Sequence, residues 1–255
     1  MSTPAAPAPR LTAIAAGILA VQLLIGVLLV ASHGGLLELL VTVDPPLVTQ
    51  DGSFGFVFGV GIRFAAETGM LAVLLVTGAL LAVIALRASR ATLTPSAAST
   101  LHWVAVSQSL GITIVIVALM NGATDAATIV PLYALAAGSA MVGWLSDRAP
   151  RHDGSRGHLW AYAFMTVFAI VPWGVVALVQ ISGLVIGAPA SVGVRVTTLV
   201  ILAATAAWAA AEWAIARPAG PAREPSRAAV LRVASSVALA SIPVGAVFAL
   251  GTLGG

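Results

Sequence analysis

The sequence contains no cysteine and no lysine, and only 8% of its 255 residues are charged. Without cysteine, the chain has no disulfide, no thiolate metal site and no cysteine nucleophile. Because all twelve basic residues are arginine, no side chain carries the primary amine that forms a Schiff base with an aldehyde. A soluble domain of this length carries about 25% charged residues. The scarcity of charge therefore excludes an ordinary soluble protein.

Apolar residues make up 60% of the chain and gather in long runs. A run of about 20 apolar residues crosses a hydrocarbon core of about 30 Å as one helix. The runs predict an all-α integral membrane protein with seven transmembrane helices in a single domain, residues 1–255. The predicted spans are 11–32, 62–86, 99–121, 126–146, 159–183, 193–216 and 228–250. The start, MSTPAAPAPR, is too rich in proline for a signal peptide, so the first helix is expected to be retained.

Arginines are distributed unequally between the loops on the two sides of these spans. Nine lie on one side, at positions 10, 87, 90, 148, 151, 156, 217, 223 and 227, whereas the other side has only Arg63 and Arg195 near span ends. The positive-inside rule then predicts a cytoplasmic N-terminus and an extracellular C-terminus in the plasma membrane. The net charge of +3 is low and the arginines lie in loops, so we expect no nucleic-acid partner.

The first predicted outer loop, about residues 33–61, contains two β-favouring stretches around Asp51-Gly52. Asp-Gly between apolar stretches is typical of a β-hairpin, and we expect a small one here. Arg63 and Glu67 follow, four residues apart in the predicted second span. This spacing predicts an ion pair on one helix face, although a ligand role for Glu67 stays open.

Few other polar groups lie inside the predicted spans. His102, near the start of the third, is interpreted as a hydrogen-bonded or solvated residue rather than a metal or haem ligand. Glu212 is interpreted as interfacial, and Arg232 as snorkelling toward the cytoplasm. No Walker loop, HExxH, GxSxG or pair of carboxylates at catalytic spacing occurs. We therefore expect neither an enzyme nor a metal site.

Five short stretches occur in an order and spacing that resemble the heliorhodopsin family. They are AETG from Ala66, LHWVAVSQS from Leu101, GSAMVGWL from Gly138, IVPWG from Ile170 and GTL from Gly251. The resemblance implies a seven-helix, rhodopsin-like bundle that forms a homodimer, with a cytoplasmic N-terminus and a hairpin in the first extracellular loop. Arginine counting and Asp51-Gly52 gave the last two features independently.

The sequence departs from the family where retinal would be attached. Heliorhodopsins bind retinal through a lysine in the last helix, and counting back from GTL places that position at Ser241. The family's counterion glutamate falls on Ala105, an arginine of the third helix on His102, and a histidine of the first on Ala20. Loss of the amine and the carboxylate together leaves no uncompensated buried charge. The resemblance thus implies the scaffold of a retinal protein without its attachment chemistry.

Three functions stay open. The first is a retinal-free sensory or interaction scaffold that a cytoplasmic protein reads through arginine-rich loops, notably SDRAPRHDGSRGH from Ser146. The second is a binding protein for a non-covalent apolar or planar ligand, which would be free retinal, a carotenoid, a lipid or a haem. The third, less favoured, is a small transporter or channel, since no internal repeat is visible. The candidate pocket comprises Trp103, Ala105, Ser109, Trp173, Trp208 and Ser241, with Glu67 and His102 as further polar candidates.

Overall fold

Seven helices dominate the computed structural model, which describes residues 8–32, 38–43, 46–48, 54–56, 60–90, 92–148, 160–217 and 225–253. They are α1 (Ala8–Ala31), α2 (Ala66–Ser89), α3 (Pro95–Met120), α4 (Ala126–Arg148), α5 (Trp160–Val185), α6 (Val192–Ala216) and α7 (Pro225–Leu253). Each overlaps one predicted span. Six are long and apolar enough to cross a membrane, and α1 adds the shorter apolar stretch Ala16–Leu28. The prediction of an integral membrane protein is confirmed.

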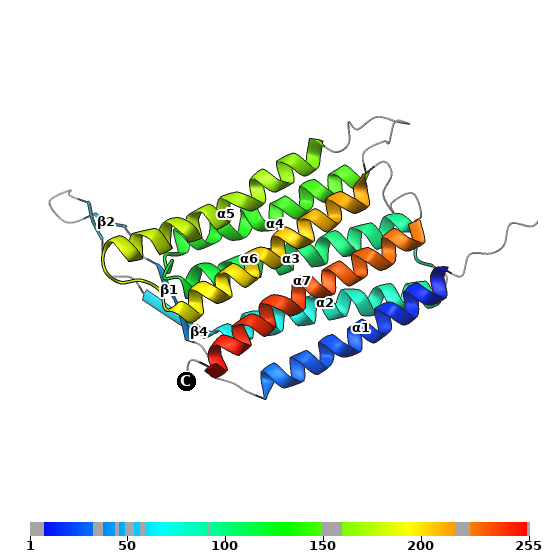
Figure 1. Ribbon diagram of the computed structural model, residues 1–255, viewed down its shortest axis with the longest axis horizontal. Helices are drawn as coiled ribbons and strands as arrows, with labels where there is room; N and C mark the ends of the chain where they lie inside the picture. The colour runs from blue at the N-terminus through cyan, green and yellow to red at the C-terminus, as the bar shows by residue number, and fades with distance from the viewer. Residues whose placement is uncertain are drawn as a thin grey trace, which may run out of the picture.

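The helices run side by side, and their connections alternate between the two ends of the bundle (Figure 1). One end, which carries the β-strands and is here called the sheet end, is where α7 finishes. The other, here called the arginine end, is where α1 begins and where Arg87, Arg148 and Arg217 lie. The two ends of the described chain therefore lie at opposite ends of the bundle, as an odd number of spans requires.

Helix α3 is the central helix. It packs against α2, α4, α5 and α7, and 72% of its apolar span is buried, compared with 17% for α5. Its start is fixed locally: Pro95 stands in the first turn, and Thr94 caps the helix by accepting a hydrogen bond from the backbone N–H of Ala97 at 3.2 Å. Because α3 lies in the middle of the bundle, several of its polar side chains are buried.

Among the described residues, four short strands precede α2. Strand β1 (Glu38–Val43) pairs antiparallel with β4 (Val60–Ala65), and β2 (Pro46–Val48) pairs antiparallel with β3 (Phe54–Phe56). This nested pairing confirms the predicted hairpin, although Asp51-Gly52 lies outside the described residues. The hairpin contacts the α3–α4 connection, where the backbone N–H of Thr42 donates to the carbonyl oxygen of Thr124 at 2.8 Å.

The predicted ion pair between Arg63 and Glu67 is wrong. Arg63 belongs to strand β4, because α2 begins only at Ala66, and the helical spacing of four does not apply across that boundary. The guanidinium of Arg63 instead lies 3.7 Å from the carboxylate of Glu38 on the paired strand, and both side chains are exposed. Such a surface pair contributes little to stability. Glu67, in the first turn of α2, is buried.

Candidate functional site

Four charged or titratable side chains from four helices meet inside the bundle near the arginine end. Arg232 of α7 donates from Nη2 to Oδ1 of Asp147 on α4 at 2.8 Å, and its Nη1 contacts the other carboxylate oxygen. Its Nε donates to Oε2 of Glu212 on α6 at 3.3 Å. Glu212 Oε1 lies 3.2 Å from Nε2 of His102 on α3. We call these four residues the ionic cluster.

The cluster is buried although it lies within two turns of the helix ends. Glu212 is fully buried, His102 is 4% exposed, and the side chains of Asp147 and Arg232 are 6% and 12% exposed. The interpretation of Arg232 as snorkelling is therefore wrong, and Glu212, although close to the end of α6, is buried inside the protein. The physical reason is mutual pairing: a charge whose partners lie inside the bundle is stabilised there rather than in water. The sequence analysis interprets His102 as hydrogen-bonded or solvated, and the structure shows it hydrogen-bonded.

Neutral hydrogen-bond donors complete the shell around the carboxylates. Asp147 Oδ2 accepts from Oγ of Ser99 at 2.8 Å and from the indole Nε1 of Trp103 at 2.9 Å. Glu212 Oε1 accepts from Oγ of Ser235 at 3.0 Å. The carboxylates thus receive hydrogen bonds as well as charge partners, which is what makes a buried ion pair tolerable.

Trp103 packs directly against the ionic cluster. Its ring is fully buried and packs edge-on against the indole of Trp208, with ring centroids 6.2 Å apart. The guanidinium carbon of Arg232 lies 5.8 Å from the Trp103 centroid, which adds a cation–π contact. Of the predicted pocket residues, the structure therefore brings together Trp103 and Trp208.

The other predicted pocket residues lie on α3, α5 and α7. Ala105 is buried on α3, Ser109 hydrogen-bonds Thr77 of α2 at 3.1 Å, and Trp173 is partly buried on α5. Ser241 is exposed on α7, so the prediction that it faces Ala105 inside the bundle is wrong. The cause is helical phase: each residue turns the side-chain direction by about 100°, and the inward positions of α7 are its buried neighbours.

The inward positions of α7 can be placed against α3 from one contact. His102 Nδ1 lies 2.8 Å from Oγ of Ser236, and both helices start at the arginine end. A position three or four residues further along either helix lies about 4.5–6 Å further along the helix axis. This places Ala105 level with Leu239 and Ala240, which are 3% and 0% exposed.

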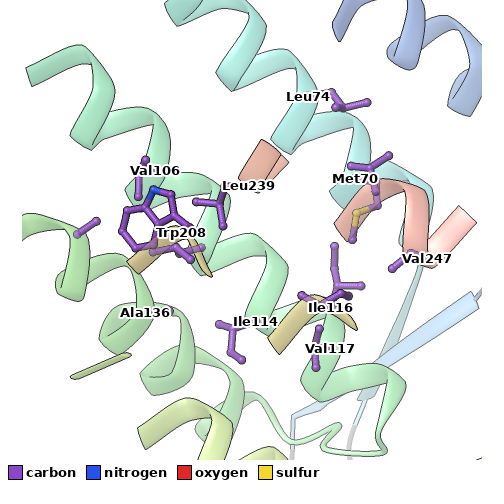
Figure 2. Packing of buried hydrophobic residues seen from close by; sticks show 14 of the residues in the cluster. Met70, Leu74, Val106, Ile114, Ile116, Val117, Ala136, Trp208, Leu239 and Val247 are labelled. Carbon is purple, nitrogen blue, oxygen red and sulfur yellow. The ribbon is translucent and has the colours of Figure 1, made fainter. Parts of the chain in front are cut away.

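Apolar side chains pack in the centre of the bundle at this level. Val106, Trp208 and Leu239 belong to one continuous cluster of buried residues (Figure 2). The residues present therefore do not fit covalently bound retinal: the chain has no lysine, and alanines stand at the level where an amine and its counterion would meet.

An apolar bundle of seven helices with a buried ionic cluster at one end defines an integral membrane protein, and the comparison with known families identifies its kind. The family model named Heliorhodopsin matches residues 60–211, which is more than half of the chain. The protein belongs to the heliorhodopsin family, as the sequence resemblance predicted. No curated protein matches the chain. The matched range runs from β4 through most of α6, so α7 lies beyond it.

Sequence reasoning missed the ionic cluster. Asp147 was not singled out, and the other three members were assessed one at a time. One signal was available: 102, 147, 212 and 232 all fall within about two turns of predicted span ends on the same side of the membrane. Four titratable or charged residues at one depth on four helices favour a shared cluster, since isolated charges at that depth are costly.

Proposed function

We propose that this heliorhodopsin-family protein works in the plasma membrane without covalently bound retinal, as a sensory or interaction scaffold. The observation that carries the proposal is the complete absence of lysine, because no other side chain forms the imine with an aldehyde. In this proposal the arginine end faces the cytoplasm, and the protein assembles as a homodimer. A cytoplasmic partner binds the arginine-rich inner loops, notably SDRAPRHDGSRGH from Ser146, most of which lies outside the described residues.

The packing at the bundle centre supports the same reading. The small side chains of Ala105 and Ala240 are accompanied by large apolar ones, among them Leu239 and Trp208, each 5% exposed or less. Alanine at both positions leaves out the amine and the counterion that a covalently bound chromophore needs, and the buried neighbours keep this level of the bundle apolar. A non-covalent chromophore in this region is the competing function, and the test below separates the two.

An absorption spectrum of the purified full chain tests the proposal first. We expect no visible band, either as isolated from cells or after addition of all-trans retinal. A Soret band or a carotenoid pattern in the isolated protein would favour the ligand-binding function. A visible band that forms with retinal and is bleached by hydroxylamine would overturn the proposal.

Restoring the missing chemistry provides a matched pair of variants. Ala240→Lys with Ala105→Glu places an amine and a carboxylate at the same level on the inward faces of α7 and α3. We expect this double variant to form a hydroxylamine-sensitive pigment with added retinal. Ser241→Lys with Ala105→Glu carries the same groups, but its lysine starts from the exposed face, and we expect it to stay colourless. Pigment from the second pair alone would show that the inward positions are misassigned.

A further inference from the structure

One glutamine lies near the middle of the membrane on the outer side of α3. Gln108 is 13 residues from the first and 12 residues from the last residue of that helix, so about 18–20 Å of helix separate it from either end. Its side chain is partly exposed. Water and lipid headgroups do not reach the middle of a hydrocarbon core about 30 Å thick, so a polar group at this depth needs a protein partner.

Tyr133 of α4 satisfies only one end of this carboxamide. Its hydroxyl donates to Oε1 of Gln108 at 2.6 Å. Gly111 makes room for the contact, since a Cβ atom added there would lie 2.6 Å from Cε2 of the Tyr133 ring. None of the described residues accepts a hydrogen bond from Nε2 of Gln108. Turning the amide around would leave its oxygen without a partner instead, so one polar end stays free in either orientation.

The surface around Gln108 suits the approach of another helix. The residues at helical spacing on the same side of α3 are all apolar and at least partly exposed: Leu101, Val104, Ile112 and Val115. On α4, Ala134 follows Tyr133 and is exposed, and a Cβ atom added at Gly138, one turn later, would meet nothing within 4 Å. Small residues on the outer side of a transmembrane helix let a second backbone come close.

A second copy of this chain carries the matching group at the required depth. Copies inserted in the same orientation hold Gln108 at the same depth, and a two-fold axis beside α3, along the membrane normal, brings the two carboxamides face to face. Nε2 of each then donates to Oε1 of the other, which still has a lone pair after accepting from Tyr133. A partner of different sequence would need its own donor and acceptor at this one depth.

We infer that the outer face of α3 and α4 around Gln108 is an interface with a second copy, joined by reciprocal hydrogen bonds between the two Gln108 carboxamides. The inference rests on the homodimer of the proposed function and names the face and the residue that form it. It does not depend on whether the chain binds a chromophore. A single polar position in an otherwise apolar contact between helices fixes which residues face each other, so Gln108 also sets the register of the pair.

Disulfide cross-linking of the full chain in lipid vesicles tests the face, because the chain has no cysteine of its own. Val104→Cys lies one turn before Gln108 on α3, and Val167→Cys on α5 is the matched control. The two valines are 37% and 58% exposed and lie nine and seven residues after the starts of their helices, which both begin at the arginine end (Figure 1). A disulfide forms only when the two Cα atoms come within about 7 Å. We expect oxidation to link Val104→Cys into a covalent dimer and to leave Val167→Cys unlinked. Linking of Val167→Cys alone, equal linking of both, or linking of neither would overturn the inference.

Counting fluorescently tagged copies in vesicles, as lipid dilutes the protein, separates the role of the amide from the homodimer itself. Gln108→Leu removes the carboxamide at similar size, and we expect pairing to require about tenfold more protein per lipid, as for the loss of two interhelical hydrogen bonds. Gln180→Leu is the matched control, because that amide donates to Asn121 inside the protein at 2.7 Å, and it should pair like the unmodified chain. Pairing of Gln108→Leu that equals that of the unmodified chain or of the control would overturn the inference and leave the homodimer standing. A chain that stays single at every dilution would remove both.

Discussion

A single glycine allows Trp103 to reach the ionic cluster. A Cβ atom added at Gly143 would collide with the indole ring, and even the Cζ2 atom of that ring would be 2.9 Å away. Gly143 lies one helical turn before Asp147, the residue that accepts from Trp103 Nε1. The absence of a side chain on α4 thus sets the depth at which the ring lies and so positions its N–H.

We predict that Gly143→Ala destabilises the protein by about 1–3 kcal/mol, the usual cost of overpacking a buried site. The ring must move, and the hydrogen bond from Trp103 to Asp147 is strained or lost. Chemical or thermal unfolding in detergent measures the change. Gly138→Ala on the same helix is the control: its Cβ would meet nothing within 4 Å, and alanine favours a helix over glycine by up to about 1 kcal/mol. If the two substitutions change the free energy of unfolding equally, the close contact between Gly143 and the Trp103 ring does not contribute to stability.

At the scale of elements, Asp125 joins helix α4 to the hairpin. Its carboxylate accepts from the backbone N–H groups of Ala127 and Thr128 at 3.2 and 3.1 Å, which caps α4. Its backbone also forms a bridge with Thr42 of β1. The start of α4 and the position of the hairpin therefore depend on the same residue.

We predict that Asp125→Ala lowers stability by about 0.5–2 kcal/mol through the lost cap, and also loosens the hairpin. Hydrogen exchange should show faster exchange at the Thr42 amide, which donates to the neighbouring Thr124 carbonyl. Thr94→Ala removes the cap of α3 and serves as the control, since Thr94 lies at the opposite end of the bundle from the hairpin. We expect a similar loss of stability there with unchanged exchange at Thr42. If exchange at Thr42 is unchanged in both variants, the cap that Asp125 forms does not hold the hairpin in place.

The elements themselves followed from the sequence, because apolar runs interrupted by proline, glycine and arginine leave little choice of where helices lie. The errors arose where a boundary or a phase mattered. Arg63 was assigned to a helix because apolar composition does not distinguish β4 from the first turn of α2. Ser241 was placed inward because counting from a distant motif tolerates an error of one residue, which helix geometry does not.

The candidate site was less predictable than the fold for a physical reason. Glu212 and Arg232 are separated by a loop in the sequence, and Asp147 and His102 lie on two further helices. Their burial depends on one another, so each alone resembles an ordinary charge at a membrane surface. Only the packing of α3, α4, α6 and α7 brings the four together.

At the scale of the whole molecule, the surface of the bundle is typical of one that faces lipid. Large apolar side chains are exposed along several helices, among them Leu28 of α1, Leu178 of α5 and Leu199 of α6, each more than 60% exposed. At the arginine end, the guanidinium groups of Arg148 and Arg217 stack on Trp144 and Trp213. Tryptophan with arginine is typical of the boundary between hydrocarbon and headgroups, and the arginine favours the cytoplasmic side.

The absence of cysteine makes the orientation directly measurable, since any introduced thiol is the only one in the chain. We predict that Ser155→Cys, in the arginine-rich loop, reacts with a membrane-impermeant maleimide only after cells are permeabilised. Ser53→Cys, beside Asp51-Gly52, should react in intact cells. The reason is that nine arginines lie on one side of the predicted spans and two on the other, and the positive-inside rule places the side with more arginines in the cytoplasm. Both variants change a serine to its nearest analogue in a predicted loop, so each controls for the other. Labelling of Ser155→Cys in intact cells, with protection of Ser53→Cys, would reverse the orientation and place the ionic cluster on the extracellular side.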